Sequence, residues 1–87
     1  MQEYCYHLDT IGLKKVQLVI YHSHAYFCSD TFYAPFGLAD LASMFMVSDY
    51  CFDFIFEGEK LFQVSDKQLS QIMQIVEKHR NEEAETV

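Results

Sequence analysis

Basic side chains are missing from the middle of this sequence, which has no lysine or arginine over residues 16–59. Binding to a nucleic-acid backbone depends on such side chains, because they neutralise phosphates, so we expect no direct contact with nucleic acid. The chain carries 13 acids against 6 bases, a formal net charge of −7. A larger protein with a basic surface is the natural complement of this charge, although acidity also keeps a protein soluble without any partner.

Glycine, proline and cysteine are also scarce, with three, one and three residues respectively. The glycines stand singly, so the sequence contains no glycine-rich loop for a phosphate group. A single proline, without any low-complexity segment, argues against disorder. Cys5, Cys28 and Cys51 form no CxxC pair, and their odd number argues against the disulfide framework of a secreted protein. Buried, reduced thiols are the expected state.

Long apolar runs are absent as well. The longest uncharged run in the first half of the chain, residues 16–29, is too short to span a membrane. The N-terminus has no basic segment followed by an apolar run, which is the pattern of a signal peptide. The sequence therefore predicts a cytoplasmic location and no membrane partner.

Hydrophobic residues, in contrast, make up 51% of the chain and aromatic residues 16%, which predicts one small domain over residues 1–87. Apolar and polar residues alternate over residues 2–9 and 14–21, and a shorter strand is predicted at 25–28. Residues 14–21 also fit helical spacing, but their valine and isoleucine content favours a strand. Residues 29–37 hold the only proline and are predicted to be a loop, whose aromatic side chains either form an exposed patch or close the core.

Residues 50–64 have the pattern of a β-hairpin. Aromatic residues alternate with other residues along the first strand, as they do in a strand with one buried face. All four aromatic residues are expected to face the core: Tyr50, Phe52, Phe54 and Phe56. Glu57, Gly58 and Glu59 form the predicted turn, because glycine tolerates a positive φ, and residues 60–64 form the return strand.

Two helices are predicted. Residues 38–47 are apolar on nearly every side, so this helix should be deeply packed or lie at an interface. Ser65 and Gln68 have the spacing of a capping box at the start of a helix that ends near Asn81, and residues 82–87 are expected to fray. The predicted fold is α+β, an antiparallel sheet of about five strands with both helices on one face, in the order ββ(β)αββα. The helix-free face would present Glu3, His7, Asp9, Asp53 and Glu57.

His22 and His24 are the best candidate metal ligands, because residues two positions apart on a strand point the same way. Asp30, His7 or Cys28 could supply a third ligand, but nothing at metal-site spacing accompanies the pair. Cys28 could also act as a nucleophile with a histidine base, but the sequence shows no signature of such an enzyme. We therefore predict neither enzymatic activity nor a cofactor.

These observations favour a small acidic protein-binding module that inhibits a larger partner by occupying its basic, nucleic-acid-binding surface. Anti-CRISPR and anti-restriction inhibitors of phage and mobile elements act in this way, as do immunity proteins against nucleases. The analogy rests on size, charge and the lack of a catalytic signature rather than on a motif. Charges would govern the encounter and aromatic anchors the affinity. The predicted contact residues are Asp30, Tyr33, Phe36, Asp40, Asp49, Tyr50, Asp53, Glu57 and Glu59.

Two alternatives stay open. The first is a homodimeric assembly module that associates through Phe36, Met44 and Met46, because an 87-residue monomer has difficulty burying so much apolar surface. The second is a small metal- or thiol-dependent enzyme that uses the two histidines and the Cys28 thiol described above.

Overall fold

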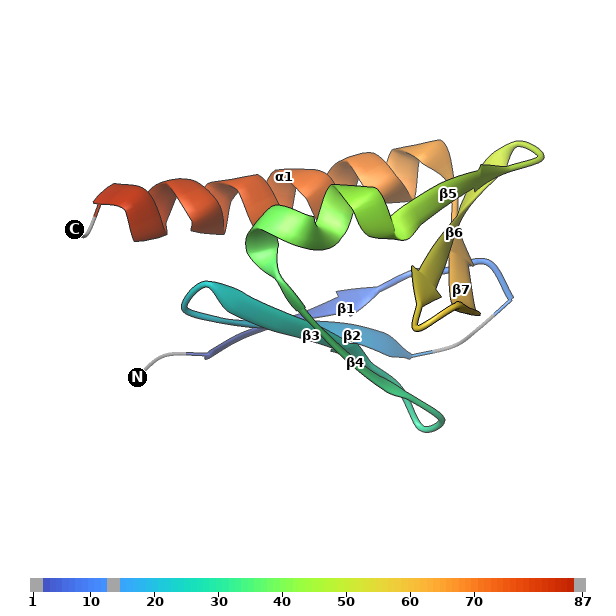
Figure 1. Ribbon diagram of the computed structural model, residues 1–87, viewed down its shortest axis with the longest axis horizontal. Helices are drawn as coiled ribbons and strands as arrows, with labels where there is room; N and C mark the ends of the chain where they lie inside the picture. The colour runs from blue at the N-terminus through green and yellow to red at the C-terminus, as the bar shows by residue number, and fades with distance from the viewer. Residues whose placement is uncertain (1–2, 13–14, 86–87) are drawn as a thin grey trace.

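The structure is a computed structural model that describes residues 3–12 and 15–85, which form two antiparallel sheets, a 3₁₀ helix and an α-helix (Figure 1). The first sheet has the strand order β1-β2-β3-β4 and the second the order β5-β6-β7. The strands are β1 (Glu3–Leu8), β2 (Val16–Tyr21), β3 (His24–Cys28), β4 (Tyr33–Gly37), β5 (Phe45–Ser48), β6 (Cys51–Phe56) and β7 (Glu59–Val64). The helices are the 3₁₀ helix η1 (Leu38–Met44) and α1 (Asp66–Glu85).

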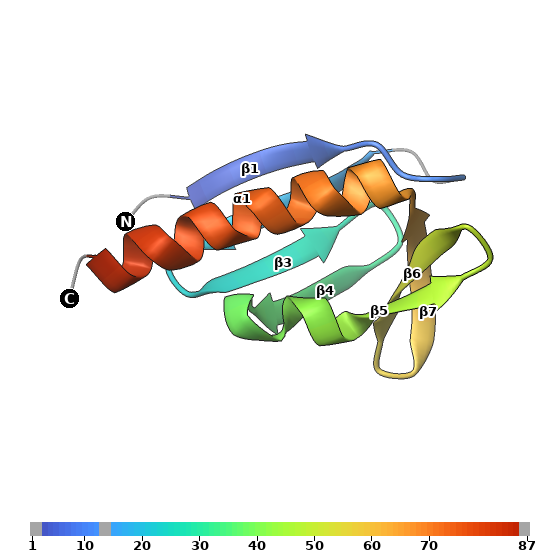
Figure 2. The same ribbon diagram turned by 90° about the horizontal axis from the view of Figure 1, so that it is seen from above.

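The four-stranded sheet is a meander with one buried face. Alternate residues of β2, namely Val16, Leu18 and Ile20, are buried. Phe27 of β3 lies on the same side, because the register pairs it with Leu18. Both η1 and α1 lie over this face in two perpendicular views (Figures 1 and 2). The core therefore lies between the sheet and the helices.

Phenylalanine rings from both sheets meet in the core. The ring centroid of Phe27, in the first sheet, lies 4.8 Å from that of Phe54 and 5.0 Å from that of Phe62, both edge-on. Phe54 and Phe62 stack on each other at 5.0 Å. These contacts hold the second sheet against one end of the first (Figure 2). They confirm the predicted hairpin and the burial of Phe54.

The start of α1 confirms the predicted capping box. The backbone N–H of Gln68 donates to the Ser65 hydroxyl at 3.1 Å, and the backbone N–H of Ser65 donates to the Gln68 side-chain carbonyl at 2.8 Å. Two N–H groups that the helix leaves without a backbone acceptor are thereby satisfied. The helical spacing of Leu69, Ile72, Met73 and Val76 predicts one buried stripe. Ile72 and Val76 are buried, and Leu69 and Met73 are partly buried against the core.

The other end of α1 extends further than the sequence predicts. The helix runs to Glu85, so the prediction that it ends near Asn81 is wrong, and residues 86–87 lie outside the described residues. The buried His79 joins α1 to β1 close to the predicted end: its Nε2 lies 2.9 Å from the hydroxyl of Tyr6, and its ring centroid lies 4.6 Å from that of Tyr4.

Two segments differ from the prediction. Residues 29–37 contain the strand β4 rather than only a loop, and Ala34 and Phe36 point into the core while Pro35 points away. Pro35 is compatible with this strand because β4 lies at the edge of the sheet, where a residue without a backbone N–H need not interrupt the hydrogen bonds between strands. Residues 38–47 are not one helix: η1 ends at Met44, and β5 follows.

The α+β class holds, whereas the single five-stranded sheet and the order ββ(β)αββα are wrong in detail, because the strands divide into sheets of four and three. The predicted strands over residues 2–9 and 14–21 are observed as β1 and β2, and their first residues, Gln2 and Lys14, lie outside the described residues. The expectation of buried thiols fails for Cys5, which is exposed, while Cys28 and Cys51 are partly buried.

Candidate interaction site

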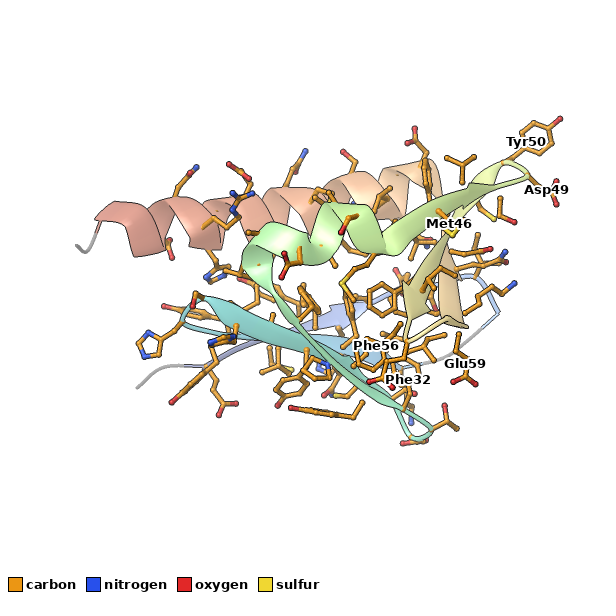
Figure 3. The ribbon with its side chains drawn as sticks, in the orientation of Figure 1. Phe32, Met46, Asp49, Tyr50, Phe56 and Glu59 are labelled. Atoms are coloured by element: carbon orange, nitrogen blue, oxygen red, sulfur yellow. The ribbon has the colours of Figure 1, made fainter. Side chains whose placement is uncertain are left out.

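The β5–β6 hairpin carries the two most exposed apolar side chains of the described residues, Tyr50 in the turn and Val47 on β5, together with the exposed Met46. Tyr50 is fully exposed at 103%, Val47 is 79% exposed and Met46 is 59% exposed. Asp49 precedes Tyr50 in the turn with a φ of 43°, a left-handed conformation that aspartate tolerates better than most residues. Figure 3 shows Tyr50 and Asp49 projecting from the end of the hairpin. We call Met46, Val47, Asp49 and Tyr50 the hairpin tip.

Tyr50 was predicted to face the core with the three phenylalanines that follow it, and this is wrong. Strand β6 begins only at Cys51, so Tyr50 belongs to the turn and not to the alternating segment. Of the three phenylalanines, Phe54 is completely buried, and Phe52 and Phe56 are partly buried against the core. Tyr50 nevertheless stays among the predicted contact residues.

The predicted acidic residues do not gather on one surface. Asp30 lies before β4, Asp40 lies on η1, and Asp49 lies at the hairpin tip, all of them exposed. Glu57 and Glu59 lie around the β6–β7 turn, at the opposite end of β6 from the hairpin tip. The length of six strand residues separates these two turns by roughly 17 Å. The acids therefore surround the second sheet and its approaches instead of forming one array.

Asp53 lies on the outer side of the second sheet. Its partners in the register are Met46 on β5 and Gln63 on β7. The Gln63 side-chain N–H donates to the Asp53 Oδ1 at 2.7 Å, and the aspartate is partly buried. The expected single acidic face is thus wrong, since Glu3 and His7 belong to the first sheet and Asp53 to the second.

Three other predicted contact residues have different environments. Tyr33 is 61% exposed on the outer face of β4. Phe36 is only 7% exposed and packs in the core, with its ring centroid 4.9 Å from that of Phe27, so its ring does not form part of the exposed surface. Met44 is partly buried against the core. A dimer surface formed jointly by Phe36, Met44 and Met46 is therefore not present, because only Met46 is exposed.

The histidine and cysteine candidates do not converge. Among the described residues, no three His, Cys, Asp or Glu side chains are placed to hold a metal ion. His22 lies in the β2–β3 turn with a φ of 57°, and His24 and Cys28 lie at opposite ends of β3. The Cys28 thiol lies 3.8 Å from the Gln17 side-chain carbonyl. Burial raises the pKa of the Cys28 thiol, and the neighbouring Cys5 adds to the effect, so the reactive thiolate is disfavoured.

A second surface is the outer face of the four-stranded sheet, where the sequence predicted Glu3 and His7 but not the three tyrosines beside them. The register arranges its outward-facing side chains in three rows across the strands. These rows are Glu3–Tyr21–His24–Gly37, Cys5–Val19–Tyr26–Pro35 and His7–Gln17–Cys28–Tyr33. Neither helix lies on this side of the sheet (Figure 1). The signal was present in the alternation of β2, β3 and β4, which places one tyrosine of each strand on the face opposite the core.

No family model, curated protein or solved structure matches this chain. Over residues 3–12 and 15–85, neither helix has the length and apolar character needed to cross a membrane.

Proposed function

We propose that this protein is a small protein-binding module that docks on a larger partner with a basic surface, and that the hairpin tip is its main contact. The observation that carries the proposal is the complete exposure of Tyr50 beside the exposed Val47 and Met46. Large apolar side chains exposed on one protruding hairpin, Met46 and Val47 on opposite faces of β5 and Tyr50 in the turn, are costly to leave in water and mark interaction surfaces. Tyrosine is also among the residues that contribute most to protein–protein affinity.

The charge of the chain supports a basic partner. The net charge is −7, and no lysine or arginine occurs over residues 16–59, a range that includes β5, β6 and the first residue of β7. Such a field accelerates association with a positively charged surface. Asp49 at the tip provides a charge beside the aromatic anchor. In its more specific form, the proposal is that the module inhibits its partner by covering a nucleic-acid-binding surface and has no catalytic activity of its own.

Affinity capture from the native host, with wild type and Tyr50→Ala compared side by side, tests the proposal. Tyr50 is fully exposed, so its removal should change the free energy of unfolding by less than about 0.5 kcal/mol. Loss of a central tyrosine should weaken binding to the captured partner by about tenfold or more. Ile11→Ala is the control, because Ile11 is an exposed apolar side chain outside both the hairpin tip and the predicted contact residues. An unchanged dissociation constant for Tyr50→Ala would refute the proposed contact.

Asp49→Asn tests the electrostatic part separately. Asparagine tolerates the positive φ of this position, so the substitution removes the charge without straining the turn. We expect a slower association rate at low salt and a difference that disappears at high salt. Competition between the protein and nucleic acid for the captured partner tests inhibition: the protein should displace a bound oligonucleotide.

Self-association is the second candidate, and it is favoured by the position of β5. This strand is at one edge of its sheet, and no other described strand pairs with its free side. Two of its residues, Met46 and Val47, have exposed side chains. Such an edge can pair with the same strand of a second copy. Sedimentation equilibrium distinguishes the two candidates, since a dimer that Val47→Lys converts to a monomer would establish the edge contact.

A further inference from the structure

The outer face of the four-stranded sheet contains a hollow of about 630 Å³. The polar and aromatic side chains that line it are Glu3, Tyr21, His24, Tyr26 and Tyr33, and Gly37 lies at one end. The ring centroids of Tyr26 and Tyr33 lie 4.9 Å apart at an angle of 44°, so the two rings form an angled wall. Glu3 pairs with Tyr21 in the register, which brings its carboxylate to the tyrosines.

Gly37 accounts for the open end of this hollow. It closes the row that begins with Glu3 and Tyr21, and it has no side chain to fill the space beside His24. Its φ of −82° is accessible to any residue, so conformation does not demand glycine here. Glycine is favoured at position 37 because the Asp40 side chain lies close to it: a Cβ there would lie 3.0 Å from the Asp40 Oδ2. Asp40 therefore places a second carboxylate against the edge of the hollow.

The chemistry of this hollow is complementary to a cation. Tyrosine faces attract positive charge through their π electrons, and a guanidinium group also stacks on rings and pairs with carboxylates. The described lining includes one carboxylate, that of Glu3, no lysine or arginine, and one imidazole, that of His24. Burial raises the pKa of the Tyr26 phenol, and the charge of Glu3 adds to the effect, in agreement with a negative local potential.

An open sheet face with aromatic side chains can also stack nucleobases. Proteins that do so surround the aromatic residues with basic side chains that bind the phosphates. This hollow has the opposite charge, with Glu3 in its lining and Asp40 at its edge. The charge therefore favours a cation over a nucleic acid.

We propose that the hollow between Tyr21, Tyr26, Tyr33 and Glu3 is a binding pocket for an arginine side chain of a protein partner. The guanidinium group lies against the tyrosine rings and pairs with the Glu3 carboxylate. That the arginine belongs to a basic protein partner rests on the proposed function. Binding of the guanidinium group itself is nevertheless measurable without any partner.

The test uses N-acetyl-arginine methylamide as the probe and N-acetyl-citrulline methylamide as its neutral, nearly isosteric control. Nuclear magnetic resonance titration follows the ring signals of Tyr26 and Tyr33. We expect saturable binding of the arginine probe with a dissociation constant of the order of 1 mM, and binding of the citrulline probe about threefold weaker or worse. Equal affinity for the two probes overturns the proposal.

Variants locate the binding. Glu3→Gln and Tyr33→Ala alter exposed side chains, so both proteins should fold, and each should weaken binding of the arginine probe by about threefold or more. Tyr50→Ala, an exposed tyrosine outside the pocket, should leave it unchanged. Arginine binding that neither pocket variant weakens overturns the assignment, as does preferential binding of hexauridylate in this pocket. The proposed function is tested separately, because it depends on the effect of Tyr50→Ala on partner capture.

Discussion

Replacement of Phe54 by alanine should be the most destabilising single change in the hairpin. The side chain is 0% exposed. Loss of the ring removes roughly 100 Å² of buried apolar surface, about 2.5 kcal/mol at 25 cal/mol per Å². The cavity should add about 2 kcal/mol, because surrounding rings from both sheets prevent its collapse. These rings belong to Phe27, Phe36, Phe45 and Phe62.

A loss of about 4–5 kcal/mol is a large part of the stability of an 87-residue domain, which is roughly 4–13 kcal/mol. Urea unfolding followed by circular dichroism measures it. Phe54→Leu keeps most of the volume and should cost less than about 1.5 kcal/mol. Phe56→Ala, at a partly buried position of the same strand, should cost about 1–2 kcal/mol. If Phe54→Ala costs no more than Phe56→Ala, the phenylalanine cluster does not join the two sheets as described.

Three further changes test local features. Ser65→Ala removes the capping acceptor and should cost about 1 kcal/mol in urea unfolding, whereas Ser65→Asp should be nearly neutral. Gly58→Ala places a Cβ at a φ of 78° and should cost about 1–2 kcal/mol, and a neutral result would contradict the turn geometry. The folded-state pKa values of Cys28 and Tyr26 are raised above their ordinary values of 9.0 and 10.0. Their stabilising effect is thus fully present below those values and is lost as the pH rises through the folded-state values. Urea midpoints should fall over this alkaline range, and less steeply in Cys28→Ser.

Local patterns predicted much of the fold. The alternation of aromatic residues and the glycine at position 58 predicted the β6–β7 hairpin, because strand period and turn conformation depend on neighbours along the chain. Ser65 and Gln68 predicted the start of α1 for the same reason. The stripe formed by Ile72 and Val76 predicted its buried face.

The secondary-structure predictions failed where pairing with a distant strand determines the local conformation. Phe45 continues an apolar helical pattern, but β5 begins there because its backbone pairs with β6. Phe36 follows a proline in a segment predicted to be a loop, but β3 pairs with that segment and places the ring in the core. Local strand or helix propensity cannot predict either pairing, because β6 and β3 are separate strands whose position depends on the fold.

The candidate sites also include one feature that the sequence predicted and one that only the fold shows. The lack of bases over residues 16–59 was visible in composition, and it led to the expectation of a basic partner. Tyr21, Tyr26 and Tyr33 come from three strands, and only the register brings them around one hollow. Their common surface could not be predicted before the strand order was known.

The amino-acid sequence by itself determined the α+β class, the β6–β7 hairpin, the capped helix and the acidic charge. Each of these depends on composition or on residues that are neighbours along the chain. Only the tertiary structure decided that the strands form two sheets, that Tyr50 projects into solvent and that Phe36 is buried. These outcomes depend on which strands pair and which faces the helices cover, and such contacts join residues that are far apart in the sequence.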